Sequence, residues 1–210
     1  VGVILLMLSV PFANEWKKFR TVRMCLAITC FVLSASNFAS CFALDNELDA
    51  QLFSTMTLIV ASYQAMLFTT ASLVFVQSAR VHRRSVSTQL GIITAAGVLL
   101  FVSQFHFPRL FPFLFAVAIV AYIAQIALYT LAFRKDYKLC VEHLEACYDE
   151  DEQGRMRWIS RCFYSALAVG ITALFFCVIP YLSITFDLFV CTYTVYYVYI
   201  AGCVVNYRIK

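Results

Sequence analysis

Long apolar stretches separated by short polar segments run through the whole sequence. Most of these stretches are close to about 20 residues, the length that a helix needs to cross the hydrocarbon core of a bilayer. Seven follow one another along the chain, at residues 1–13, 24–44, 51–79, 90–105, 113–133, 162–183 and 188–205. The pattern predicts an all-α fold. We expect a polytopic membrane helix bundle of seven transmembrane helices, forming a single domain over residues 1–210.

The first stretch, 1–13, is too short to cross a bilayer alone. A basic segment, 14–23, follows it rather than preceding it, and this is the opposite polarity to that of a signal peptide. We therefore interpret 1–13 as the end of a first, truncated span.

Composition agrees with the membrane class. The chain is 62% hydrophobic and 13% charged, whereas a soluble domain has about half apolar and a quarter charged residues. The net charge of +4 is therefore interpreted through the membrane rather than as a sign of nucleic-acid binding.

The basic residues predict the orientation. Of the 16 Lys and Arg residues, 15 fall in the segments 14–23, 80–89, 134–161 and 206–210. In the predicted topology all four segments lie on the same side of the membrane. Only Arg109 falls on the other side, where Asp45, Glu47, Asp49 and Asp187 gather. By the positive-inside rule the basic side is cytoplasmic, so we expect the N-terminus outside and the C-terminus inside.

The longest polar segment, 134–161, is expected to be a cytoplasmic loop with an amphipathic helix at 139–148. From Asp149 to Gly170 the sequence passes from acidic through basic to apolar, which predicts a cytoplasmic helix that continues into the membrane. Arg155, Arg157 and Arg161 are expected where this helix crosses the lipid headgroups, with Trp158 among them as an interfacial anchor. In a signalling protein these four residues would couple the cytoplasmic loop to the bilayer surface.

Polar residues within the spans are the first ligand-binding candidates. Gln64 and Gln125 fit either hydrogen bonds between helices or a ligand cavity. Tyr193, Tyr196 and Tyr197 share one helical face, which fits bundle packing or a hydroxyl-lined ligand pocket.

Two further clusters have a structural and a functional interpretation. His106 and Arg109, with Asp187 and nearby Phe residues, fit an aromatic interfacial belt or a shallow site for an amphipathic ligand. Cys140, His143 and Cys147 share a helix face, but zinc normally takes four ligands from two segments. We expect an amphipathic helix there and no metal.

Catalytic motifs are missing from the sequence. It has no nucleotide-binding Gly-rich loop, no Ser/His/Asp set and no zinc-protease motif. The last span has no lysine for a retinal Schiff base, and the apolar stretches lack the mid-membrane charges that pumps usually need. We expect no enzyme activity and no cofactor.

The second half of the chain resembles a known family. The residues that carry the resemblance are Asp149-Glu150-Asp151, Arg155-Met156-Arg157-Trp158, Cys162-Phe163-Tyr164-Ser165-Ala166-Leu167, Gly170 and the Tyr-rich last span ending in Asn206-Tyr207. They resemble the membrane-embedded N-terminal region of Bacteroidetes AraC-type (helix-turn-helix) transcriptional regulators, or related histidine-kinase-like sensors. The resemblance covers roughly the last 60 residues, and the earlier spans are similar by topology only.

This resemblance implies a sensor in the bacterial inner membrane. Its cytoplasmic DNA-binding output domain would follow Lys210, and contact with DNA would come only from that domain. The expected partners are the lipid bilayer, a small or lipophilic ligand and a second copy of the chain as a homodimer. The alternatives are a small-molecule transporter or channel, and a structural subunit of a membrane complex.

Overall fold

The computed structural model describes residues 2–3, 17–41, 47–77, 83–147, 151–178, 188–189, 191–200 and 202. Within these ranges the chain is almost entirely helical and has no strand, which confirms the all-α prediction. The long helices are α2 (Lys17–Cys41), α3 (Glu47–Gln77), α4 (Arg83–His106), α5 (Phe111–Cys147) and α6 (Asp151–Val178). A shorter helix covers residues 191–200.

Four of these helices are long and apolar enough to cross a membrane. Their candidate spans are Gln51–Val76, Arg84–His106, Phe111–His143 and Arg157–Val178. They correspond to four of the expected stretches and indicate an integral membrane protein. The count of seven spans and the orientation of the termini stay predictions, and 1–13 lies outside the described residues apart from residues 2–3.

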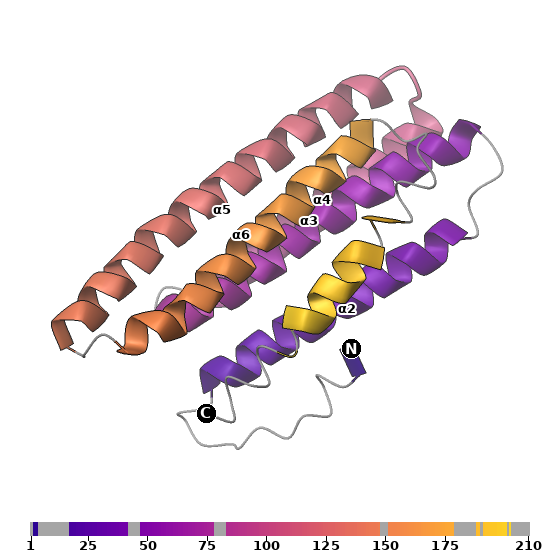
Figure 1. Cartoon of the computed structure of the whole chain (residues 1–210). Helices are drawn as coiled ribbons and strands as arrows, with labels where there is room; N and C mark the ends of the chain where they lie inside the picture. Colours follow the sequence, from indigo (N-terminus) through magenta and orange to yellow (C-terminus); the bar gives the residue numbers. More distant parts are fainter. Residues whose placement is uncertain are drawn as a thin grey trace.

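Helix α3 occupies the centre of the bundle (Figure 1) and contacts α2, α4, α5 and α6. In its most apolar stretch 61% of residues are buried, against 11% in α4, 11% in α5 and 28% in α6. Its buried polar residues are mostly small hydroxyls, such as Thr55 and Ser72, which bond back to their own helix. Small side chains of this kind let neighbouring helices approach closely.

The outer helices present large apolar side chains to their surroundings. Leu99 of α4 and Phe113 and Val120 of α5 are each more than half exposed. In water such a surface would be a large unfavourable apolar area, whereas in a bilayer it faces lipid chains. We therefore assign these faces of α4 and α5 to lipid.

Helix α5 runs without interruption out of its apolar stretch, and α6 begins only at Asp151. The polar segment expected as a cytoplasmic loop at 134–161 is therefore mostly two helix extensions, and 139–147 forms the last turns of α5. Residues 148–150 lie outside the described ranges. The α5–α6 pair projects past the ends of α3 and α4 (Figure 1).

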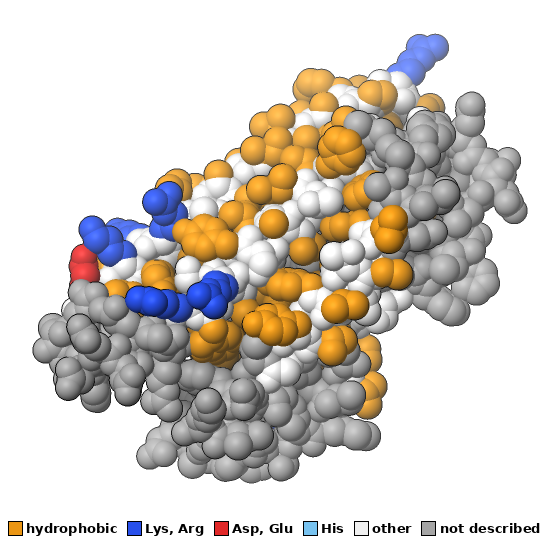
Figure 2. Space-filling model, in the orientation of Figure 1, with side chains coloured by type: hydrophobic (Ala, Val, Ile, Leu, Met, Phe, Trp, Pro, Cys, Tyr) orange, Lys and Arg blue, Asp and Glu red, His pale blue; other side chains and the backbone are white. Residues whose placement is uncertain are grey.

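The basic residues of the helices gather at this projecting end. On the visible face, Lys and Arg side chains cluster there, and one further basic side chain stands at the opposite end (Figure 2). Lys138 is 79% exposed and pairs with Glu142 across 3.6 Å. This end of the bundle is the side that the sequence predicts to be cytoplasmic.

Candidate functional site

Three successive residues of α3 join that helix to three different neighbours. The Ser62 carbonyl accepts a hydrogen bond from Gln125 Nε2 of α5 at 3.1 Å. The Tyr63 hydroxyl lies 2.6 Å from Thr94 Oγ1 of α4. Gln64 Nε2 donates to the Tyr197 hydroxyl of the 191–200 helix. Successive helix positions differ by about 100° around the axis, so the central helix can reach all three partners within one turn.

A groove of about 480 Å³ lies between α3, α4 and α5. Most of its lining is apolar, with small residues on two walls, namely Ala96 and Gly97 of α4 and Ala121 and Ala124 of α5. No lining residue carries a charge. Pockets that bind small molecules are typically roughly 300–1,000 Å³ and mostly apolar with a few polar groups, and this groove fits that description.

The polar groups of the groove gather at one end. The Tyr129 hydroxyl donates to Gln89 Oε1 at 2.9 Å, and Gln125 Nε2 lies 3.3 Å from the Tyr129 hydroxyl. Gln89 and Tyr129 are each about 8 Å along their helices from the nearest basic residues, at 1.5 Å per residue. Leu100 and Ala118 line the groove about 16 Å further into the bundle. The groove is therefore polar near the basic end and apolar toward the middle.

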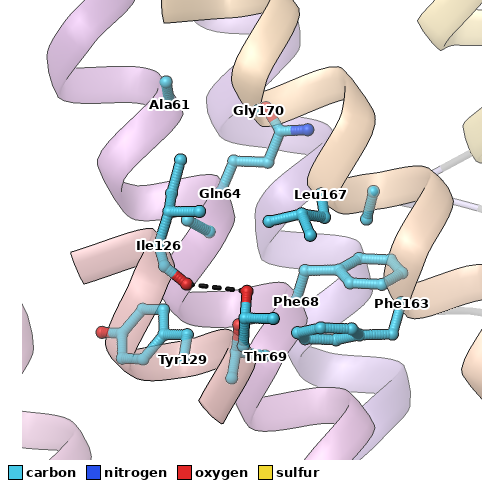
Figure 3. A pocket seen from close by; sticks show the side chains of 12 residues that line it. Ala61, Gln64, Phe68, Thr69, Ile126, Tyr129, Phe163, Leu167 and Gly170 are labelled. Atoms are coloured by element: carbon cyan, nitrogen blue, oxygen red, sulfur yellow. Dashed lines mark hydrogen bonds between the residues drawn. The ribbon is translucent and has the colours of Figure 1, made fainter. Parts of the chain in front are cut away.

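A second, much smaller cavity lies on the other side of Tyr129. It has about 30 Å³ and is lined by residues of α3, α5 and α6, including Gln64, Phe68 and Phe163 (Figure 3). Since a water molecule needs about 10–15 Å³ of such space, it can hold a water but no larger ligand. Gln64 and Gln125, for which the sequence allows either hydrogen bonds between helices or a ligand cavity, both bond to neighbouring helices. They line different cavities, and Tyr129 lines both.

Tyr193, Tyr196 and Tyr197 of the 191–200 helix face the bundle, as their spacing predicts, whereas Tyr199 is 64% exposed. Tyr193 and Tyr197 are buried, and Tyr197 stands edge-on to Phe68 with ring centroids 6.4 Å apart. The hydroxyls of Tyr196 and Tyr197 have different partners. Tyr196 donates to the Cys162 carbonyl at 2.6 Å and lies 2.6 Å from Ser165 Oγ, both on α6, whereas Tyr197 bonds to α3. The face therefore ties the helix to two neighbours.

The predicted coupling residues on α6 have different surroundings. Trp158 is half-buried and packs edge-on against Phe75 of α3, with centroids 5.6 Å apart, rather than serving only as an interfacial anchor. Arg157 and Arg161 are exposed. Arg155 lies in α6, but its side chain is outside the described part of the chain.

The remaining candidates whose side chains are described line neither cavity. His106 and Arg109 are exposed at the turn between α4 and α5, and Asp187 is outside the described residues. Cys140 is half-buried and His143 exposed, while the Cys147 side chain is not among those described. The described residues contain no group of three His, Cys, Asp or Glu side chains that could hold a metal ion.

Sequence reasoning missed two members of the polar end, Gln89 and Tyr129. Gln89 was assigned to the cytoplasmic segment 80–89, although α4 already begins at Arg83. Gln125 and Tyr129 are four residues apart, so they share a helix face. That spacing is the signal that could have revealed the pair.

No family model, curated protein or solved structure matches the chain. The groove and its connection to the 191–200 helix are the features of the described residues that bear on function.

Proposed function

We propose that this chain is a membrane-embedded sensor domain. A ligand occupies the groove between α3, α4 and α5, and α3 passes the change to the 191–200 helix. The observation that carries the proposal is the run of contacts from Ser62 to Gln64. Within two residues, the same helix bonds to the groove residue Gln125 and to Tyr197 of the 191–200 helix.

The physical route is a small change in the position of a rigid helix. A ligand in the groove adds contacts to α4 and α5 and competes for the polar groups around Gln125, so it favours a different position of α3. Any such shift is limited by the difference in ligand affinity between the two arrangements. Helix shifts of about 1–2 Å are a common form of switching, and they would be enough to break or re-aim the Gln64–Tyr197 hydrogen bond.

The output of the sensor is proposed to be transcriptional control in a bacterial inner membrane. The support is the resemblance of Asp149–Gly170 and of the Tyr-rich last span to membrane-bound AraC-type regulators. The basic end of the bundle would face the cytoplasm, and a DNA-binding domain following Lys210 would receive the signal. The coding sequence beyond Lys210 tests this output. A helix-turn-helix or kinase-like domain there supports it, and a stop codon overturns it.

The coupling can be tested without knowing the ligand. Ala96→Phe places a ring in the groove as a substitute occupant, and Ala95→Phe, exposed and outside the groove lining, is its matched control. We expect Ala96→Phe alone to change amide hydrogen exchange in residues 191–200 of the reconstituted chain. Adding Gln64→Leu should abolish this change, whereas adding Ser72→Ala, whose hydroxyl bonds only within α3, should preserve it. Identical exchange in the Ala96→Phe and Ala95→Phe variants would refute the coupling.

A further inference from the structure

We infer that the α3–α4–α5 groove binds a single-chain amphipathic ligand with an uncharged, hydrogen-bonding headgroup. The headgroup would lie at Gln89, Gln125 and Tyr129, and the apolar chain would extend toward Leu100 and Ala118. This inference rests on the proposed function, because it names the ligand class of the same groove.

The polar end of the groove has unused hydrogen-bonding capacity of both kinds. Gln89 uses its carbonyl to accept from Tyr129, and Gln125 uses its amide nitrogen to donate to Ser62 and Tyr129. The Gln89 NH₂ and the Gln125 carbonyl have no further protein partner within the described part of the chain. A side-chain amide donates through its NH₂ group and accepts through its carbonyl oxygen. A headgroup that both accepts and donates, such as a hydroxyl or an amide, therefore complements this pair.

The absence of charge in the lining selects against an ionic headgroup. Placing a charge in an apolar, poorly hydrated site is costly unless an opposite charge is nearby, and no residue of the groove supplies one. The closest basic residues in sequence, Arg84 and Arg134, are exposed and lie about 8 Å nearer the helix ends. An anionic headgroup at their level would sit above the Gln89–Gln125 pair and leave its polar groups unused.

The rest of the groove is shaped for an apolar chain. Gly97 lets α4 pack closely on α3, because a Cβ added there would lie 3.3 Å from the Ile59 side chain, which also lines the groove. On the opposite wall, the small side chains of Ala121 and Ala124 leave room for the chain. The groove continues for about 16 Å beyond the polar end, and its volume of about 480 Å³ suits one chain rather than a two-chain lipid.

Two photoreactive probes test the headgroup. The full chain is reconstituted in phosphatidylcholine nanodiscs and labelled with a diazirine-bearing monoacylglycerol or with its phosphate ester, lysophosphatidic acid, which has the same chain. Mass spectrometry then locates the label. We expect the neutral probe to label the α4 and α5 groove peptides several-fold more than the charged one. Gln89→Leu should reduce this labelling roughly three- to tenfold, the effect of losing about one hydrogen bond.

Groove-filling variants show whether the label enters the groove. Ala96→Phe and Ala124→Phe fill it from opposite walls, and the exposed residues Ala95 and Ala127, outside the lining, provide the matched controls Ala95→Phe and Ala127→Phe. Labelling should fall at least about tenfold in both filling variants and in neither control. Because two walls are tested, failure of one variant to fold does not leave the site undecided.

The outcomes separate this inference from the proposed function. Equal labelling by both probes, or labelling that is indifferent to Gln89→Leu, would mean non-specific lipid packing and overturn the inference. Preferential labelling by lysophosphatidic acid would overturn it in favour of an anionic ligand. In each case the hydrogen-exchange response to Ala96→Phe would still test the coupling. Specific labelling without any exchange response in Ala96→Phe would instead reject the sensor and keep the site.

Discussion

Gln64 of α3 and Tyr197 of the 191–200 helix form a buried hydrogen bond between residues 133 positions apart in the sequence. Removing one partner leaves the other polar group buried and unpaired, which costs more than the bond itself contributes. We expect Gln64→Leu to lower the free energy of unfolding by about 1–3 kcal/mol. The double variant Gln64→Leu/Tyr197→Phe should recover part of that loss. Thermal unfolding in detergent measures both, and strictly additive losses would contradict the pairing.

Gly170 lies against the buried Tyr122, whose hydroxyl donates to the Gly170 carbonyl at 3.1 Å. A Cβ on Gly170 would stand 3.1 Å from that hydroxyl. We expect Gly170→Ala to destabilise the bundle by about 1–2 kcal/mol through overpacking. Gly91→Ala is the control, since nothing lies within 4 Å of its added Cβ, and its higher helix propensity should be neutral or stabilising. Equal melting temperatures for the two variants would argue against this packing.

The rings of Phe133 in α5 and Phe163 in α6 stack with centroids 3.8 Å apart and planes 12° apart. Phe133 is 1% exposed, so Phe133→Ala leaves a cavity between the two helices. We expect a loss of about 3 kcal/mol in the free energy of unfolding. Phe113→Ala on the same helix is the control, because Phe113 is 69% exposed and should contribute little. A comparable loss at Phe113 would contradict the assignment of that face to lipid.

The predicted orientation can be tested at two exposed basic residues. In a variant lacking the nine native cysteines, a membrane-impermeant maleimide should label Arg109→Cys in intact cells but Lys138→Cys only after lysis. The reason is that Arg109 stands alone opposite the basic end, which the positive-inside rule places in the cytoplasm. The reverse pattern would invert the topology and place the α5–α6 extension outside.

Helix positions were largely readable from the sequence, because a span must be apolar over most of its length. The sequence did not show which helix occupies the centre of the bundle. Spans that face lipid and spans that face other helices are both apolar, and the mean hydropathy of α3, 1.7, is close to the 1.8 of the largely exposed α4. The distinguishing feature of α3 is its set of small hydroxyl residues, such as Thr55 and Ser72. Hydropathy registers such residues only as slightly polar.

The polar segment 134–161, expected as a loop that contains helices, consists mostly of extensions of α5 and α6. Charge marks where a helix leaves the membrane, but it does not end the helix. No Gly or Pro occurs between residues 113 and 150, and these are the residues that usually interrupt a helix. The sequence also did not reveal the polar end of the groove, because Gln89, Gln125 and Tyr129 come together only through the packing of α4 against α5.

Because α5 is unbroken, a small tilt of this helix at the groove produces a larger displacement at its far end. Tyr129 lies at the groove, and Cys147 follows it by 18 residues on the same helix, or about 27 Å along the axis. A tilt of only about 5° at the groove would swing the tip by about 2 Å, the scale of known switching movements. Under the proposed function, the projecting α5–α6 pair would act as a lever arm and carry the effect of groove occupancy to the basic end of the bundle.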